Sequence, residues 1–167
     1  AYTEAFYDDS EAAEYKDQAD CETNHDKGLS VLTAYLDSEH ACMADIPLGV
    51  EVQLEEDLPD LPSPVLGYID LVREGNVPVD YKTVASKPDL ELEAFMHELQ
   101  LTLYQMLIES ATGESVEARE LVFLVKTKTP KVIVHRLMPA TEREKQRVLD
   151  MSMAAVDGIY HERFHPQ

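Results

Sequence analysis

The sequence predicts an α/β fold, with helices on both faces of a mixed central β-sheet of about five strands. Short runs of apolar, often β-branched residues predict strands at 48–54, 65–72, 77–83, 121–125 and 132–137. Apolar residues at three- and four-residue steps predict helices before, between and after these strands, most clearly at 90–109. The resulting order of helices, three strands, helix, two strands and helix also fits an α+β domain.

The N-terminal part of the chain is strongly acidic. Residues 1–60 contain 17 Asp and Glu but only Lys16 and Lys27, so they carry −15 of the net charge of −19. Within this part, residues 4–20 predict a mobile, weakly amphipathic helix, and residues 29–36 predict a second helix.

We expect one domain over residues 1–167, because this length and a hydrophobic content of 44% suffice for a single core. It consists of the acidic helical part at 1–45 and a core at 48–167. Two cysteines far apart in sequence form no disulfide framework, and no apolar run approaches the roughly 20 residues that span a bilayer. These features predict a soluble protein without a secretion signal.

Two of the predicted helices should pack on the sheet. The helix at 90–109 has one apolar face, which we expect to be buried: Leu92, Phe95, Met96, Leu99, Leu103, Met106 and Leu107. The last helix starts at Thr141, with Glu144 at the capping-box position. Its expected buried residues are Val148, Met151, Ala155 and Ile159.

The net charge opposes a polyanionic partner, because binding to nucleic acid depends largely on phosphate neutralisation. The last 107 residues, however, carry only −4. Eight basic residues fall between positions 119 and 147 and could form a local positive face, although a solvated surface is the simpler interpretation. They are Arg119, Lys126, Lys128, Lys131, Arg136, Arg143, Lys145 and Arg147.

The second and third predicted strands carry a pattern that points to a metal-dependent site. A turn at Glu74–Asn76 joins them into a hairpin. If the hairpin is centred on its glycine, Asp70 and Asp80 lie directly opposite each other, since each is five positions from the turn. Side chains alternate along a strand, so Asp80 and Lys82 point the same way.

Opposed carboxylates destabilise a hairpin by a few tenths to about 1 kcal/mol, and by more when they are partly buried. A divalent cation between them converts repulsion into coordination, and ligation by oxygen alone suits Mg²⁺ or Mn²⁺. A neighbouring lysine can orient or deprotonate the attacking water and stabilise charge that develops on a phosphate. The combination suits phosphodiester hydrolysis. A lone Asp-x-Lys is common, so further residues are needed to support this hypothesis.

The following helix supplies such residues. Gln100 and Tyr104 are four positions apart, so they share one helix face and can act as one polar patch beside the hairpin. Tyr104 as an ordinary core aromatic is the alternative.

At this point the chain resembles the PD-(D/E)XK nuclease superfamily, in its RecB-like branch. The matching motifs are Gly67–Asp70, then Val79–Thr83, then the Q-x-x-x-Y motif Gln100–Tyr104. Together, in this order, they are far more specific than any one of them. The resemblance spans about residue 50 to the C-terminus and implies a restriction-endonuclease-like catalytic core.

The resemblance also implies a metal site for Mg²⁺ or Mn²⁺. Asp70 and Asp80 would bind the ion, and the backbone carbonyl of Tyr81 would be a further ligand. Glu51 corresponds to an acidic residue often seen on the strand before the G-x-x-D motif, which makes it another candidate ligand.

The remaining motif residues would complete the catalytic set. Lys82 would be the catalytic lysine, beside Asp70 and Asp80. Gln100 and Tyr104 would position DNA and the site residues.

The implied function is that of a metal-dependent DNA nuclease of exonuclease type, as in phage recombination or bacterial DNA repair. We expect DNA as its partner, no membrane, and a cytoplasmic location in a bacterium or a phage-infected cell. A homo-oligomer or a recombination or helicase partner could supply the grip on DNA. The alternative is a catalytically inactive nuclease-like module for binding or assembly, which the acidic N-terminal part favours.

Two features of known relatives are not matched. Members of this branch usually carry a metal-binding histidine on a helix well before the G-x-x-D motif. His25 and His40 fit in position only, and we expect each in a surface loop. Some relatives hold an iron–sulfur cluster through one early and three late cysteines, and with only Cys21 and Cys42 no such cluster is expected.

A competing pattern lies at the end of the sequence. His161–His165 matches H-E-x-x-H, the helical motif in which two histidines bind Zn²⁺ and the glutamate activates water. Pro166 follows at once, so we expect the helix to fray there. A zinc peptidase is therefore the remote alternative.

Overall fold

The computed structural model describes residues 15–41 and 46–163. The chain forms two compact units. One comprises the chain up to residue 44 together with 81–88 and 122–134, and the other comprises 45–80, 89–121 and 135–167. None of the helices within the described ranges is long and apolar enough to cross a membrane.

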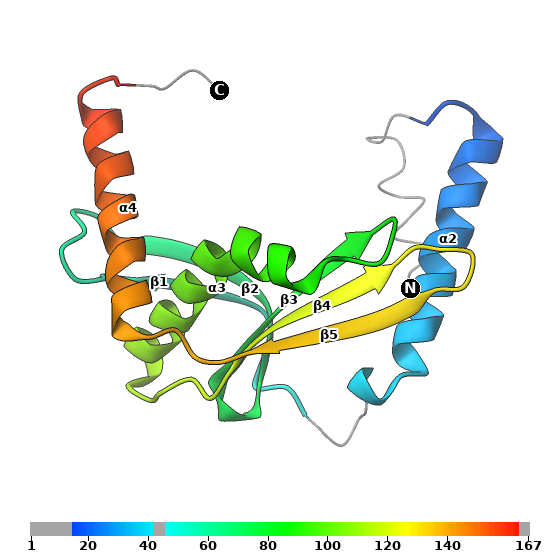
Figure 1. Ribbon diagram of the computed structural model, residues 1–167, viewed down its shortest axis with the longest axis horizontal. Coiled ribbons are helices and arrows are strands. Elements are labelled where there is room, and N and C mark those ends of the chain that lie inside the picture. The colour runs from blue at the N-terminus through cyan, green and yellow to red at the C-terminus, as the bar shows by residue number, and fades with distance from the viewer. Residues whose placement is uncertain (1–14, 42–45, 164–167) are drawn as a thin grey trace. The chain divides into compact units, whose positions relative to one another are not determined.

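Five strands form one sheet in the order β1-β2-β3-β4-β5 (Figure 1). They are β1 (Gly49–Glu56), β2 (Val65–Arg73), β3 (Val77–Val84), β4 (Arg119–Val125) and β5 (Lys131–Leu137). β2 pairs antiparallel with both β1 and β3. β3 and β4 run in the same direction, as strands joined through a helix usually do (Figure 1). The prediction of a mixed sheet of about five strands flanked by helices is confirmed.

The first described helix, α2 (Gln18–Leu36), differs from the prediction. We expected separate helices at 4–20 and 29–36, whereas α2 runs unbroken through Gly28. Its start is fixed by Asp17, whose side chain accepts a hydrogen bond from the backbone N–H of Asp20 at 2.9 Å. A glycine inside a helix costs only about 1 kcal/mol, so a well-capped helix continues through it. Most of the predicted helix at 4–20 lies outside the described residues.

Helix α3 (Leu90–Thr112) connects β3 to β4 and contacts β1 and β2. Asp89 caps its start, and Gly113 ends it with a left-handed backbone of φ 72°. Its buried side chains all lie in the second half: Leu101, Thr102, Gln105, Met106, Leu107 and Ile108. The prediction of one buried face along the whole helix is therefore wrong for the first half, where Leu92, Phe95, Met96 and Leu99 are exposed.

Helix α4 (Glu142–Tyr160) begins with the predicted capping box between Thr141 and Glu144. Backbone and hydroxyl hydrogen bonds from Thr141 hold the pKa of Glu144 below its ordinary value, against the opposing effect of burial. Val148 and Leu149 are buried against α3 and the segment after β1, where Met106 and Leu58 join their cluster.

The expected buried face of α4 does not continue beyond this cluster. Met151, Ala155 and Ile159 are exposed, so the prediction for these three residues is wrong. Like α3, α4 packs along only part of its length, because the described chain provides apolar neighbours only near its first two turns.

A polar cluster joins α3 to α4. The buried Gln105 accepts a hydrogen bond from the Ala140 N–H at 2.7 Å and donates to Glu109 at 2.9 Å. Lys145 donates to Glu109 at 2.7 Å. Burial alone would raise the pKa of Glu109, but the hydrogen bonds from Lys145, Gln105 and the Val116 N–H outweigh it and hold that pKa below its ordinary value.

The Glu109–Lys145 pair predicts a loss of stability in acid. The folded chain lowers the pKa of Glu109 from 4.5, so its stabilising effect is complete above that pH and is lost as the pH falls through the folded value. We expect Glu109→Gln to cost about 1 kcal/mol near neutral pH, as for an ion pair that solvent partly screens. The difference from wild type should shrink in acid, as measured by urea unfolding across the pH range.

Glu55→Gln, at an exposed position of β1, is the control. Its stability difference from wild type should be small and should change little over the same range. A Glu109→Gln difference that grows as the pH falls would contradict the assigned pKa direction.

Candidate active site

The β2–β3 hairpin has the register that the sequence predicted. Its pairs are Leu71 with Val79, Val72 with Pro78, and Arg73 with Val77. The same register, continued by one pair, sets Asp70 opposite Asp80. The turn contains Gly75 at φ 74° and Asn76 at φ 56°, so both residues adopt the left-handed backbone that a tight turn requires.

The two aspartates differ in exposure. Only 3% of Asp80 is exposed, whereas Asp70 is half-buried. Burial of an ionised carboxylate costs free energy unless charged or hydrogen-bonding groups compensate it. A buried acid opposite a second acid therefore requires neighbouring groups or a cation that offset the repulsion between them.

Glu51 lies on β1 beside this pair. Val50 pairs with Leu71 and Val52 with Ile69, so Glu51 falls next to Asp70 in the register. Its φ of 48° departs from strand geometry, and its side chain is exposed. Within residues 15–41 and 46–163, no three His, Cys, Asp or Glu side chains gather closely enough to hold a metal ion, so Glu51 does not join the aspartates in such a group.

Two aspartates still fit a hard divalent cation. Mg²⁺ typically takes one or two protein carboxylates and completes its shell with water and substrate phosphate oxygens. Asp70, Asp80 and a backbone carbonyl supply oxygen donors only, which is the donor chemistry that Mg²⁺ and Mn²⁺ select.

The G-x-x-D and Q-x-x-x-Y motifs lie in contact. A Cβ atom at Gly67 would lie 2.5 Å from Leu107 Cδ1 and 3.7 Å from the Tyr104 ring, so the absence of a side chain lets α3 approach β2. On α3, Gln100 Nε2 donates a hydrogen bond to the Tyr104 hydroxyl at 2.8 Å. Gln100 and Tyr104 therefore form the predicted i, i+4 pair, held against the strand that carries Asp70.

Tyr81 and Lys82 follow Asp80 on β3 and belong to the other compact unit. Within that unit the Tyr81 hydroxyl lies 2.6 Å from the Tyr35 hydroxyl of α2, and their rings meet edge to face at 5.6 Å. This contact fixes the segment whose backbone carbonyl is a candidate ligand. Lys82 is half-buried.

The basic residues near the C-terminus do not form a free positive face. Arg119 is buried and donates to the Thr102 hydroxyl at 2.8 Å, and Arg136 pairs with the buried Glu120. Lys145 and Arg147 pair with acids of α3. Internal partners thus bind these four of the eight basic residues, and the buried Arg119 also does not fit the alternative of a solvated surface.

A family model described as the PD-(D/E)XK nuclease superfamily matches residues 4–167. The chain belongs to the PD-(D/E)XK nuclease superfamily. A search of curated protein sequences found no match.

Comparison with solved structures found matches of low sequence identity. One is the crystal structure of a protein from Eubacterium rectale named Putative exonuclease, with a TM-score of 0.65 at 17% identity over 87% of this chain. The chain covers 57% of that protein, little more than half of its length. Another is the crystal structure of SSO0001, with a TM-score of 0.47 at 16% identity, covering 90% of this chain and 70% of that one.

The structure revises one expectation about the histidines. His25 is not a surface loop residue, because it lies inside α2 with only 11% of its side chain exposed. His40 lies in the short 3₁₀ helix η2 (Glu39–Ala41), with a third of its side chain exposed. His25 therefore precedes the G-x-x-D motif on a helix, a setting that the sequence analysis did not predict because it placed the second helix only after Gly28.

The first residues of the H-E-x-x-H pattern, His161 and Glu162, are not part of a helix. α4 ends at Tyr160, and Glu162 has a left-handed φ of 52°. The helical turn that would align the motif's glutamate with its histidines is therefore absent from the described part of this pattern. His165 lies outside the described residues.

The Gly67 contact predicts that a larger residue at the first position of the G-x-x-D motif destabilises the fold. Gly67→Ala would place a methyl group against the buried Leu107, and we expect it to destabilise the fold by about 1 to 3 kcal/mol through overpacking. Chemical denaturation measures this. Gly158→Ala in α4 is the control, since its Cβ would meet nothing closer than 3.4 Å and alanine favours a helix. Equal effects of the two substitutions would contradict the close approach at Gly67.

Proposed function

We propose that the protein is a Mg²⁺- or Mn²⁺-dependent DNA nuclease of exonuclease type. The observation that carries the proposal is the register that sets Asp70 opposite the buried Asp80, in a chain that belongs to a nuclease superfamily. Two carboxylates on facing positions of neighbouring strands form the oxygen-donor pair that Mg²⁺ or Mn²⁺ binds.

In this proposal Asp70 and Asp80 hold the metal ion, with the Tyr81 carbonyl as a third oxygen ligand. Glu51 belongs to the outer part of the site, since its exposed side chain leaves it outside a three-carboxylate group. When bound, the ion supplies Lewis-acid stabilisation of phosphate charge.

The other residues act on the substrate and the attacking water. Lys82 lies two positions after Asp80 on β3, so strand alternation gives both side chains the same face. Its ammonium orients the water and stabilises the negative charge that develops on the phosphate. Gln100 and Tyr104 hold each other by a hydrogen bond and position DNA beside the acids.

We propose that the substrate is DNA with a free end, in a bacterial or phage setting. The name of the Eubacterium rectale protein favours an exonuclease over an endonuclease. Phage recombination or bacterial DNA repair in the cytoplasm would supply such a substrate. The acidic N-terminal part repels phosphates, so a helicase or recombination partner, or another copy of the chain, would supply part of the grip on DNA.

The catalytic assignment predicts separate effects on binding and on chemistry. Asp80→Asn should abolish detectable Mn²⁺ binding in calorimetry. Lys82→Ala should retain Mn²⁺ binding but slow digestion of single- and double-stranded DNA by about 10²- to 10³-fold, the usual contribution of one positioned group that stabilises transition-state charge. Lys87→Ala, at an exposed lysine shortly after β3, is the matched control and should retain full activity.

Digestion that survives in Lys82→Ala at the wild-type rate would exclude the proposed role of the lysine. Binding of Mn²⁺ without digestion by the wild type, with either metal and either form of DNA, would favour the inactive binding module.

A further inference from the structure

Helix α2 carries a stripe of buried and half-buried side chains that ends at Tyr35. These positions recur at three- and four-residue steps, so they share one face of the helix. The stripe includes Cys21, Asn24, His25, Gly28, Val31, Leu32 and Tyr35. Val31 is 4% exposed and anchors the stripe, and Tyr35 follows one turn later.

The contact between Tyr35 and Tyr81 of β3 has two parts. The two hydroxyls lie 2.6 Å apart, and the rings meet edge to face with their centroids 5.6 Å apart. Both residues are half-buried. A phenol hydroxyl withdrawn from water needs a hydrogen-bond partner, and here each hydroxyl supplies a partner for the other.

Both sides of this contact are fixed by further hydrogen bonds within one compact unit. Ser38 donates to the Tyr35 carbonyl from its side chain at 2.6 Å and from its backbone N–H at 3.0 Å. At the end of β3, the Val84 carbonyl accepts from the Lys126 N–H at 2.7 Å. Because the end of α2 is held in this way, Tyr35 can restrain the strand that carries Tyr81.

We propose that Tyr35 is a positioning residue for the metal-dependent reaction. Its contact with Tyr81 holds the Tyr81 carbonyl and the Lys82 side chain in the orientation that the metal ion and the phosphate require. Successive side chains on a strand point to opposite faces, so fixing Tyr81 on one face also fixes Lys82 on the other. This inference rests on the proposed function, which uses both groups.

The effect of such a residue on the site should exceed its effect on the fold. Groups that orient a metal ligand without touching the metal typically contribute about 10- to 100-fold to metal affinity or activity. A single hydrogen bond between two half-buried hydroxyls makes only a modest net contribution to stability. Loss of the Tyr35 hydroxyl should therefore change metal binding in a chain that remains folded.

Calorimetric titration of the full chain with Mn²⁺ tests the positioning role. Tyr35→Phe keeps the ring contact but removes the hydrogen bond, and we expect it to weaken Mn²⁺ binding about tenfold. Tyr35→Leu removes both parts of the contact and should weaken binding further. Circular dichroism establishes that the variants are folded.

A double-mutant cycle tests whether the two tyrosines act as one pair. Tyr81→Phe removes the same hydrogen bond as Tyr35→Phe, so it should weaken Mn²⁺ binding equally. The combined variant should be no weaker than either single one, about tenfold rather than the roughly hundredfold product of independent effects. With Mn²⁺ at saturation, the same variants should lower kcat for DNA digestion and leave KM unchanged, because the orientation of Lys82 acts on the chemical step.

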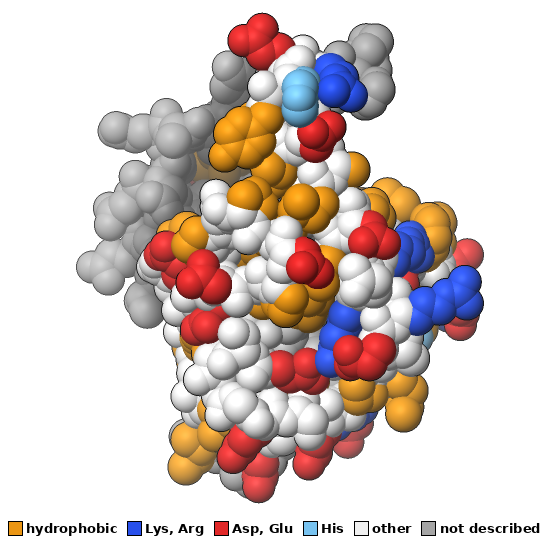
Figure 2. All heavy atoms as spheres, turned by 90° about the vertical axis from the view of Figure 1, so that its left-hand side faces the viewer, with side chains coloured by type: hydrophobic (Ala, Val, Ile, Leu, Met, Phe, Trp, Pro, Cys, Tyr) orange, Lys and Arg blue, Asp and Glu red, His pale blue; other side chains and the backbone are white. Residues whose placement is uncertain are grey.

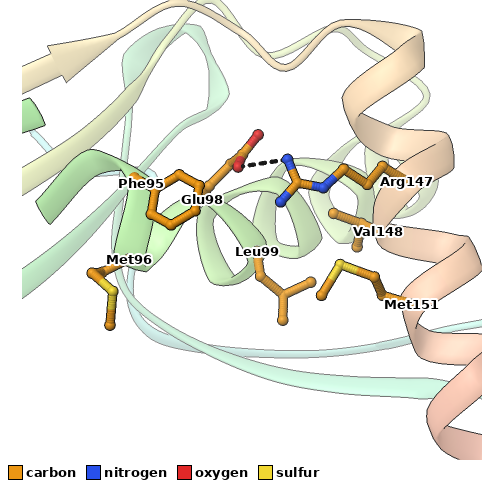
Figure 3. Close-up of a pocket in the computed structure, with 7 residues that line it drawn as sticks. All are labelled: Phe95, Met96, Glu98, Leu99, Arg147, Val148 and Met151. Carbon is orange, nitrogen blue, oxygen red and sulfur yellow. Dashed lines mark hydrogen bonds and ion pairs between the residues drawn. The ribbon is translucent and has the colours of Figure 1, made fainter. Parts of the chain in front are cut away.

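Glu98→Gln is the matched control. Charged and hydrophobic side chains mix on the side of the molecule that carries α4 (Figure 2). Glu98 of α3 pairs with Arg147 of α4 at 3.1 Å, beside a groove that Leu99 and Met151 help to line (Figure 3). Like Tyr35→Phe, this substitution removes one contact between distant parts of the sequence. No residue that lines the groove belongs to the three motifs, so Glu98→Gln should leave Mn²⁺ affinity and digestion unchanged.

The outcomes separate this inference from the proposed function. Mn²⁺ binding by Tyr35→Phe equal to that of the wild type would overturn the positioning role and leave the metal site intact. A combined variant that shows the full product of the two single effects would also overturn it, because the tyrosines would then act independently. A wild type that binds no Mn²⁺ would reject the metal site, and the positioning role with it. If the wild type binds Mn²⁺ but digests no DNA, the nuclease is rejected and the calorimetric comparison still decides the role of Tyr35.

Discussion

The close approach of α3 to β2 at Gly67 is the constraint on which the rest of the structure depends. One residue without a side chain lets Leu107 and Tyr104 lie against the strand. That contact positions the Gln100–Tyr104 pair over the strand that carries Asp70, and it anchors the helix whose second half builds the core with α4. A motif that begins with glycine is thus explained by packing as much as by chemistry.

Several acidic side chains of the core pair with basic ones. Glu109, Glu120 and Glu98 each form an ion pair with a basic residue. Asp70 and Asp80 face each other across the hairpin, so two like charges meet there. Natural sequences keep such arrangements mainly where function requires them, which is why this pair leads to the proposed site.

Periodicity and turn chemistry made much of the fold predictable. All five strands and the helices from α3 onward follow the predicted ranges, because alternation, the Glu74–Asn76 turn and the Thr141 capping box are local signals. The hairpin register followed from counting residues to the turn. The unbroken α2 was missed, because Gly28 weakens a local helix signal without ending the helix. Apolar spacing alone also could not say which half of α3 meets the sheet, because that depends on where distant strands end.

The site residues on the β2–β3 hairpin and on α3 were predictable because their relative positions depend on short stretches of sequence. The placement of His25 depends on how α2 folds as a whole, and the backbone departure at Glu51 has no signal in the sequence. The first half of α3 differs from these cases. Its apolar spacing predicts burial, whereas its apolar side chains are exposed in the described chain. Hydrophobic spacing shows which residues a helix can bury, and the described neighbours of α3 cover only its second half.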